Sequence, residues 1–67
     1  MRLEEIERVR ERAIAAHKAG RITTAVRMRV TGLCSSATGQ DIIGREAKRD
    51  QLLNSALVLL ETTEAKP

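Results

Sequence analysis

Apolar residues recur every three or four positions near the start of the chain, which is the spacing of one face of an α-helix. The positions are Leu3, Ile6, Val9, Ala13 and Ala16. Charged residues fill the opposite face, acids crowd the first turn, and Gly20 is a residue of the kind that commonly ends a helix. The pattern predicts an α-helix over residues 2–19.

A second pattern of this kind covers the last third of the chain. Asp41 is expected to cap the helix, which is predicted to cover residues 41–61. The stripe comprises Ile43, Ala47, Leu53, Leu57 and Leu60. From Ala56 to Leu60 the pattern is apolar nearly all round, which indicates a segment buried on more than one side. Residues 63–67 are polar and are expected to form a frayed tail.

The middle of the chain fits two patterns. Residues 22–31 alternate with a period of two, as a β-strand does, whereas Val26, Val30 and Leu33 fit a helix with Thr23 or Thr24 as its N-cap. A single strand has nothing to pair with inside this chain, so we favour a helix over residues 23–36. The alternative is an α-β-α chain in which residues 22–31 pair with the same strand of a second copy. Residues 32–40, rich in Gly and Ser, are expected to be the main connector.

The size and composition favour an assembled protein. The chain has 67 residues and no aromatic residue, and its one cysteine allows no internal disulfide. A domain this small is marginally stable alone, and oligomerisation is the remedy still open. We therefore predict an all-α fold of two to three helices in a single domain of residues 1–62, assembled as a homo-oligomeric helical bundle. The expected interface comprises Leu53, Ala56, Leu57, Val58 and Leu60.

The charges are distributed unevenly. The net charge is +3, but residues 12–40 contain five bases and no acid. An acid-free segment of this kind suggests an anionic partner, with nucleic acid as the first expectation. Nine of the twelve basic residues are Arg, which makes bidentate contacts to phosphate. Arg27 and Arg29 are the leading candidates for contact, followed by Arg21, Lys18 and Arg12.

No catalytic constellation is recognisable. The one histidine, His17, has no indicated partner for acid–base work, and Cys34 is expected to be a small buried filler. We expect no metal, no cofactor and no enzymatic activity. The start of the chain lacks the pattern of a signal peptide, and the longest apolar run, 56–60, is far shorter than the ~20 residues that span a bilayer. A cytoplasmic protein is expected.

The run Gly44-Arg45-Glu46-Ala47, with Leu53 and Ala56 after it, is faintly similar to the helical hairpin of phage proteins that sequester cyclic-nucleotide immune signals. The similarity covers about a dozen residues, is shifted by one position and lacks the hairpin's aromatic residue. It implies a phosphate contact for Arg45 alone. We therefore expect a regulatory protein of bacterial or phage type that binds nucleic acid. The alternatives are a protein–protein adaptor or inhibitor that docks through its last helix, and a protein that sequesters a small anionic nucleotide.

Overall fold

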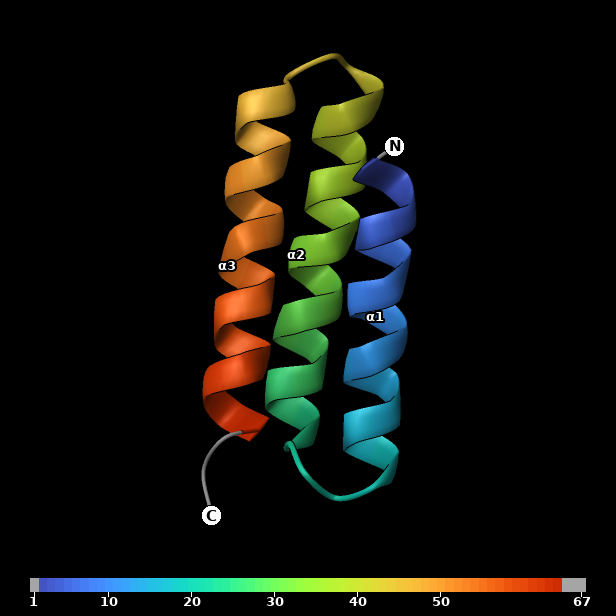
Figure 1. Cartoon of the computed structure of the whole chain (residues 1–67), viewed down its shortest axis with the longest axis vertical. Coiled ribbons are helices and arrows are strands. Elements are labelled where there is room, and N and C mark those ends of the chain that lie inside the picture. The colour runs from blue at the N-terminus through green and yellow to red at the C-terminus, as the bar shows by residue number, and fades with distance from the viewer. Residues whose placement is uncertain (1, 65–67) are drawn as a thin grey trace.

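The computed structural model describes residues 2–64 and consists of three α-helices (Figure 1). These are α1 (Arg2–Lys18), α2 (Thr24–Ile42) and α3 (Glu46–Glu64). They run up and down alternately in a bundle 38 Å long. α2 packs against both other helices and makes most of the contacts between helices, whereas α1 and α3 touch little. The predicted all-α fold is confirmed, and no helix within residues 2–64 is long and apolar enough to cross a membrane.

Two glycines end the first two helices in the same way. Gly20 and Gly44 have positive φ angles of 76° and 81°, which side chains with a Cβ rarely adopt. At the first of these ends the N–H of Arg21 donates to the carbonyl of Ala16, and at the second the N–H of Arg45 donates to the carbonyl of Gln40. Both are Schellman motifs, which reverse the chain within a few residues. The predicted role of Gly20 is confirmed.

The core is built from small and branched aliphatic side chains, and four of its members are alanines. The apolar stripe of α1 meets Val30, Cys34 and Ala37 of α2 and Leu53, Ala56 and Leu60 of α3. Alanines allow close approach of the helices but bury little area each, so the hydrophobic stabilisation of this bundle is limited.

The connector between the second and third helices differs from the prediction. Residues 32–40 continue α2, and the chain turns instead at residues 43–45. The helix survives its turn-forming residues because its inner side is buried against the other helices. Two threonine hydroxyls bond back to its carbonyls. Thr31 donates to the carbonyl of Met28 and Thr38 to that of Cys34. The predicted end at residue 36 and the predicted start of the last helix at Asp41 are therefore wrong.

The strand alternative is also wrong, since residues 24–31 belong to α2 and no strand occurs in the described chain. Thr23, one of the two predicted N-cap residues, is the N-cap of α2, and its Oγ1 accepts a hydrogen bond from the N–H of Val26. At the other end of the chain, Thr63 and Glu64 were expected in a frayed tail but form the last turn of α3. The remainder of that tail lies outside the described residues.

Candidate functional site

The side of α2 that faces solvent carries no charge along its centre. The buried residues Val30, Cys34 and Ala37 point into the core, and the residues on the opposite side of the helix are exposed. We call this surface the outer face of α2; it comprises Ala25, Met28, Gly32, Ser35, Ser36 and Gly39. All but Met28 are small, and Ser35, on the edge towards α1, accepts a hydrogen bond from Arg10 at 3.0 Å. A partner can therefore approach the helix backbone closely at Ala25, Gly32, Ser36 and Gly39.

Arg27 and Arg29 stand on opposite edges of the outer face. Two residues along an α-helix correspond to a rotation of about 200°, so the two side chains leave the helix on different flanks. Arg29 is exposed, whereas Arg27 is partly buried and its Nε has no hydrogen-bond acceptor among the described residues. Neither guanidinium forms an ion pair with an acid between Leu3 and Glu64. Both charges are therefore uncompensated within the described residues; Arg29 faces solvent, whereas the Nε of Arg27 is shielded from it.

The one acid of α2 is turned away from this face. Asp41 accepts a hydrogen bond from Nη1 of Arg49, a residue of α3 that is only 8% exposed. Asp50 accepts from the same guanidinium at 3.0 Å. The bonds to Asp41 first and Asp50 second raise the pKa of Arg49, so it stays charged and holds the start of α3 against the end of α2. Asp41 thus neutralises an inner cation and leaves the outer face without an acid.

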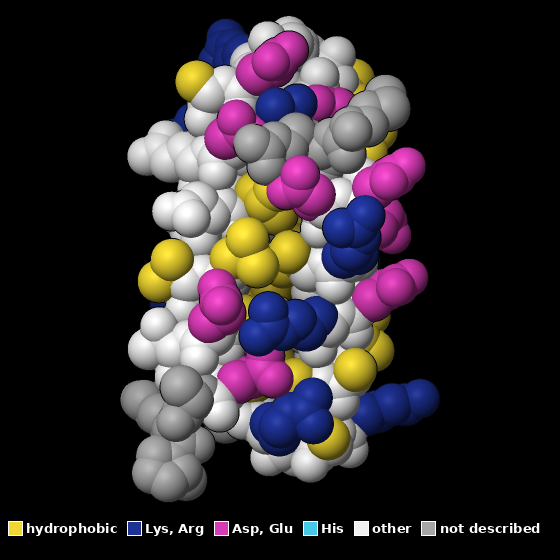
Figure 2. Space-filling view, in the orientation of Figure 1, with side chains coloured by type: hydrophobic (Ala, Val, Ile, Leu, Met, Phe, Trp, Pro, Cys, Tyr) yellow, Lys and Arg dark blue, Asp and Glu magenta, His cyan; other side chains and the backbone are white. Residues whose placement is uncertain are grey.

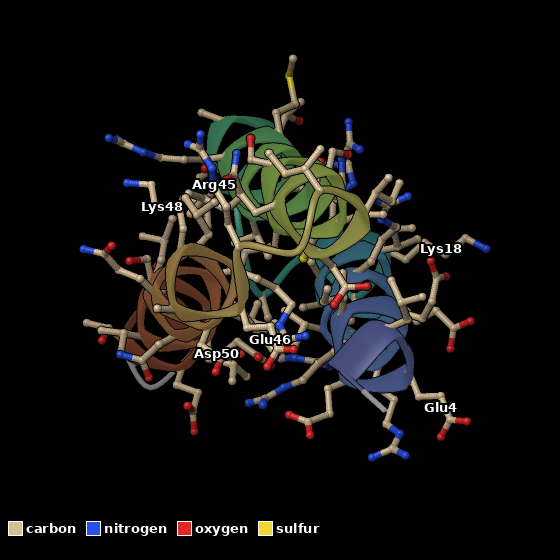
Figure 3. All side chains as sticks on the ribbon, turned by 90° about the horizontal axis from the view of Figure 1, so that it is seen from above. Glu4, Lys18, Arg45, Glu46, Lys48 and Asp50 are labelled. Carbon is tan, nitrogen blue, oxygen red and sulfur yellow. The ribbon has the colours of Figure 1, made fainter. Side chains whose placement is uncertain are left out.

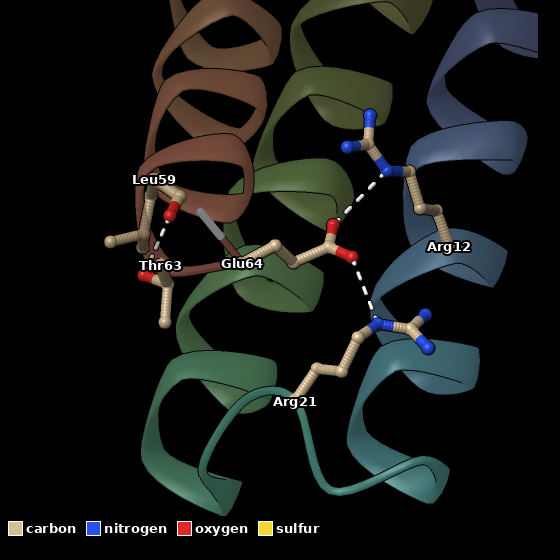
Figure 4. A network of polar contacts seen from close by, with 5 residues as sticks. All are labelled: Arg12, Arg21, Leu59, Thr63 and Glu64. Atoms are coloured by element: carbon tan, nitrogen blue, oxygen red, sulfur yellow. Dashed lines mark hydrogen bonds and ion pairs between the residues drawn. The ribbon is translucent and has the colours of Figure 1, made fainter. Parts of the chain in front are cut away.

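Two other predicted contact residues are occupied within the protein. Glu64 accepts from Nε of Arg12 at 3.1 Å and from Nε of Arg21 at 3.2 Å (Figure 4). Its side chain is only 16% exposed, whereas those of the two arginines are about half exposed. The carboxylate joins α1, the loop after it and the end of α3. Arg12 and Arg21 belong to the acid-free segment of the sequence, but this distant acid pairs with both and compensates one of their two charges.

The remaining predicted bases lie at the ends of the bundle. Lys18 is exposed in the last turn of α1, and Arg45 is exposed in the turn between α2 and α3. Seen from above, Arg45 and Lys48 extend on one side of α3, and Glu46 and Asp50 lie on the other (Figure 3). Lys48 was not among the predicted contact residues, although its distance of three residues from Arg45 places both near one side of a helix start. Arg27, Arg29 and Arg45 therefore do not form one compact patch.

The opposite side of the molecule has mixed charges. We call the junction of α1 and α3 the seam. In the view of Figure 2, apolar side chains form a column along it, with acids and bases on both sides. The four acids of α3 follow at steps of four, eleven and three residues, which places them on one side of that helix. They are Glu46, Asp50, Glu61 and Glu64.

The predicted interface residues separate into two groups. Leu53, Ala56 and Leu60 lie in the core of this chain. Leu57 is partly buried, and Val58 is 54% exposed. Val58 lines a hollow of about 520 Å³ on the surface of α3, together with Asn54, Ser55, Leu59 and Thr62. An assembly of folded chains through this helix therefore has Val58 and its neighbours to use.

The two residues considered for chemistry have structural surroundings. Nε2 of His17 lies 3.0 Å from Oγ1 of Thr24, which links the end of α1 to the start of α2. Cys34 is fully buried, as predicted, and burial raises the pKa of its thiol. Glu7 raises this pKa further and Arg10 lowers it. The thiol is thus held in its unreactive, protonated form. Within residues 2–64 no group of His, Cys, Asp and Glu side chains could hold a metal ion.

Comparison with known proteins adds no relative: no family model, no curated protein and no solved structure matches this chain.

Proposed function

We propose that this protein is a small, non-enzymatic regulatory protein that binds nucleic acid through the outer face of α2. The observation that carries the proposal is the acid-free helix face with one unpaired arginine on each edge, Arg27 and Arg29. Such a face attracts anions, and phosphate contacts supply most of the affinity of proteins for nucleic acid in the absence of sequence readout.

The dimensions of α2 support a duplex as the ligand. An α-helix with its side chains is about 10–12 Å across, and the major groove of B-DNA is about 12 Å wide. A helix in that groove faces a phosphate backbone on each side, so arginines on opposite edges suit it better than arginines on one face. Gly32 and Gly39 lie between those edges, and a Cβ added at either would meet nothing within 4 Å in the protein. They leave room for the floor of the groove.

Assembly and location complete the proposal. We expect the folded chain to work as a homo-oligomer in the cytoplasm, because its aliphatic core is small and its single thiol is unpaired and buried. Assembled copies would present several α2 helices to the same nucleic acid.

The salt dependence of binding to random duplex DNA tests the ligand class. If phosphates are contacted, the logarithm of the association constant falls linearly with the logarithm of the salt concentration, by about 0.9 for each contact. Two contacts from each copy predict a slope of about −1.8 per copy. No measurable binding at low salt would contradict the proposal.

A protein–protein adaptor is the second candidate, and the hollow around Val58 favours it. There an exposed apolar side chain lies among Asn54, Ser55 and Thr62, which offer hydrogen bonds. This mixture is typical of surfaces that bind other proteins. In that case Val58→Asp would abolish binding to the target, while replacement of Arg27 and Arg29 would leave it intact.

Sequestration of a small anionic nucleotide is the third candidate. Asp41 binds Arg49 and does not cap α3, so its carboxylate does not occupy the first N–H groups of that helix. Arg45 directly precedes these N–H groups in the chain. Free N–H groups at a helix start favour phosphates. Calorimetric titration with cyclic dinucleotides distinguishes this function, because Arg45→Ala would weaken it and Arg29→Ala would not.

A further inference from the structure

The turn between α2 and α3 exposes two large apolar side chains side by side in the sequence. Ile42 is 76% exposed and Ile43 is 60% exposed. The turn that carries them is held firmly, by the Schellman bonds around Gly44 and by the Asp41–Arg49 pair beneath it. A fixed apolar projection of this kind is ready to enter a complementary surface with little loss of conformational entropy. We call Ile42 and Ile43 the tip.

The same chain offers such a surface. The hollow on α3 is shallow and open, and its lining combines the exposed Val58 and the half-buried Leu59 with three polar side chains, Asn54, Ser55 and Thr62. Glu61 is exposed and follows Val58 by three residues, so it stands on the same side of the helix. Arg45 and Lys48, both exposed, follow Ile43 by two and five residues at the start of α3. The tip is therefore apolar and is followed by two bases, and the hollow is partly apolar with an acidic neighbour.

We propose that the tip of one copy inserts into the α3 hollow of a second copy, with Arg45 of the first facing Glu61 of the second. The inference deepens the proposed assembly and rests on it. A chain cannot fill its own hollow, because Val58 lies twelve residues beyond the start of α3, or about 18 Å along the helix. Each copy thus presents one tip and one empty hollow.

The contact is heterologous, since it joins two different surfaces. A heterologous contact repeats from copy to copy, and it forms a ring if the rotation between copies closes and a filament if it does not. It also leaves the outer face of α2 uncovered between Arg27 and Ser36. Assembly through the tip and binding of nucleic acid through α2 are therefore compatible.

Complementation between two variants tests this contact. The tip variant carries Ile42→Asp and Ile43→Asp, and the hollow variant carries Val58→Asp. Because all three residues are largely exposed, each variant is expected to keep its helical circular dichroism spectrum. Each alone should sediment as a 7.4 kDa monomer at concentrations that assemble the wild type. An equimolar mixture should form a dimer of twice that mass, because one intact tip and one intact hollow remain.

Matched controls separate this contact from other modes of assembly. Met28→Asp, at an exposed apolar residue of the outer face, should leave assembly unchanged. Glu61→Arg should weaken assembly at least tenfold, and adding Arg45→Glu to it should restore most of the loss.

A mixture of the two variants that stays monomeric would overturn the tip-to-hollow contact, but the homo-oligomer would still stand if the wild type assembles. A monomeric wild type would overturn both, and DNA binding measured on the same samples reports on the ligand separately.

Discussion

The two sides of the bundle, the seam and the outer face of α2, show how the same residue type acquires different roles. On the seam side, Arg12, Arg21 and Arg49 each meet a carboxylate from another helix or from the chain beyond a turn. On the outer side, Arg27 and Arg29 meet none within the described chain. All five are arginines, so the difference lies in where the acids stand: Glu64 of α3 meets Arg12 and Arg21, and Asp41 of α2 together with Asp50 of α3 meets Arg49. A basic residue in an acid-free stretch of sequence can bind an external anion only if the fold also keeps the protein's own carboxylates away from it.

The largest contrast is expected between a seam-side core residue and an outer-face residue. Leu60 is fully buried and Met28 is 60% exposed. Leu60→Ala should lower the free energy of unfolding by about 2–5 kcal/mol, because it removes buried area and leaves a cavity. Met28→Ala should change it by less than about 0.5 kcal/mol. Urea unfolding followed by circular dichroism measures both, and equal effects would contradict the orientation of α2 and α3 in the bundle.

The glycines of the outer face provide the next contrast. Gly32 and Gly39 lie in the helix with ordinary φ angles and open space around them, so alanine fits at both positions. Each substitution should raise the free energy of unfolding by about 0.8–1 kcal/mol, since glycine disfavours a helix interior. The affinity for duplex DNA should fall at the same time, because two methyl groups then stand between α2 and the groove. Thermal unfolding and DNA titration of Gly32→Ala/Gly39→Ala check this pair of effects. Unchanged affinity in the stabilised variant would exclude close contact along this face.

The smallest effect on stability is expected at the seam. Glu64→Gln removes the carboxylate shared by Arg12 and Arg21 while keeping the size of the side chain. Because both arginines are about half exposed, the loss of stability should be no more than about 1 kcal/mol. Two uncompensated cations should at the same time raise the affinity for polyanions. Binding to heparin or DNA at a series of salt concentrations measures the gain, and a weaker affinity than wild type would show that Glu64 positions the binding surface.

The sequence predicted some parts of this structure well. The spacing of Ile6, Val9 and Ala13 predicted α1 nearly to its ends, and Gly20 marked its end because only a positive φ angle allows that turn. Thr23 was one of two predicted N-caps. These features are local, since each depends on residues within one or two turns of helix.

Other parts depended on distant residues and could not be predicted. The glycines and serines of residues 32–40 favour a turn locally, but burial of Cys34 and Ala37 against the other helices keeps this segment helical. Asp41 was predicted to be an N-cap from its position before an apolar pattern. Its actual partner, Arg49, stands eight positions later, where no local pattern reveals the contact. Arg12 and Glu64 are 52 residues apart, so no local pattern reveals that they pair.

The central claim is that Arg27 and Arg29 are more available to phosphate than Arg12 and Arg21 are. The most direct measurement is the salt dependence of duplex DNA binding for two double variants with the same change of charge. Arg27→Ala/Arg29→Ala should flatten the slope of log K against log salt by about 1.8 and weaken binding, with the helical spectrum retained. Arg12→Ala/Arg21→Ala should flatten the slope by no more than about 0.9, because Glu64 pairs with both cations and compensates one of their two charges. Equal slopes for the two variants would contradict the account.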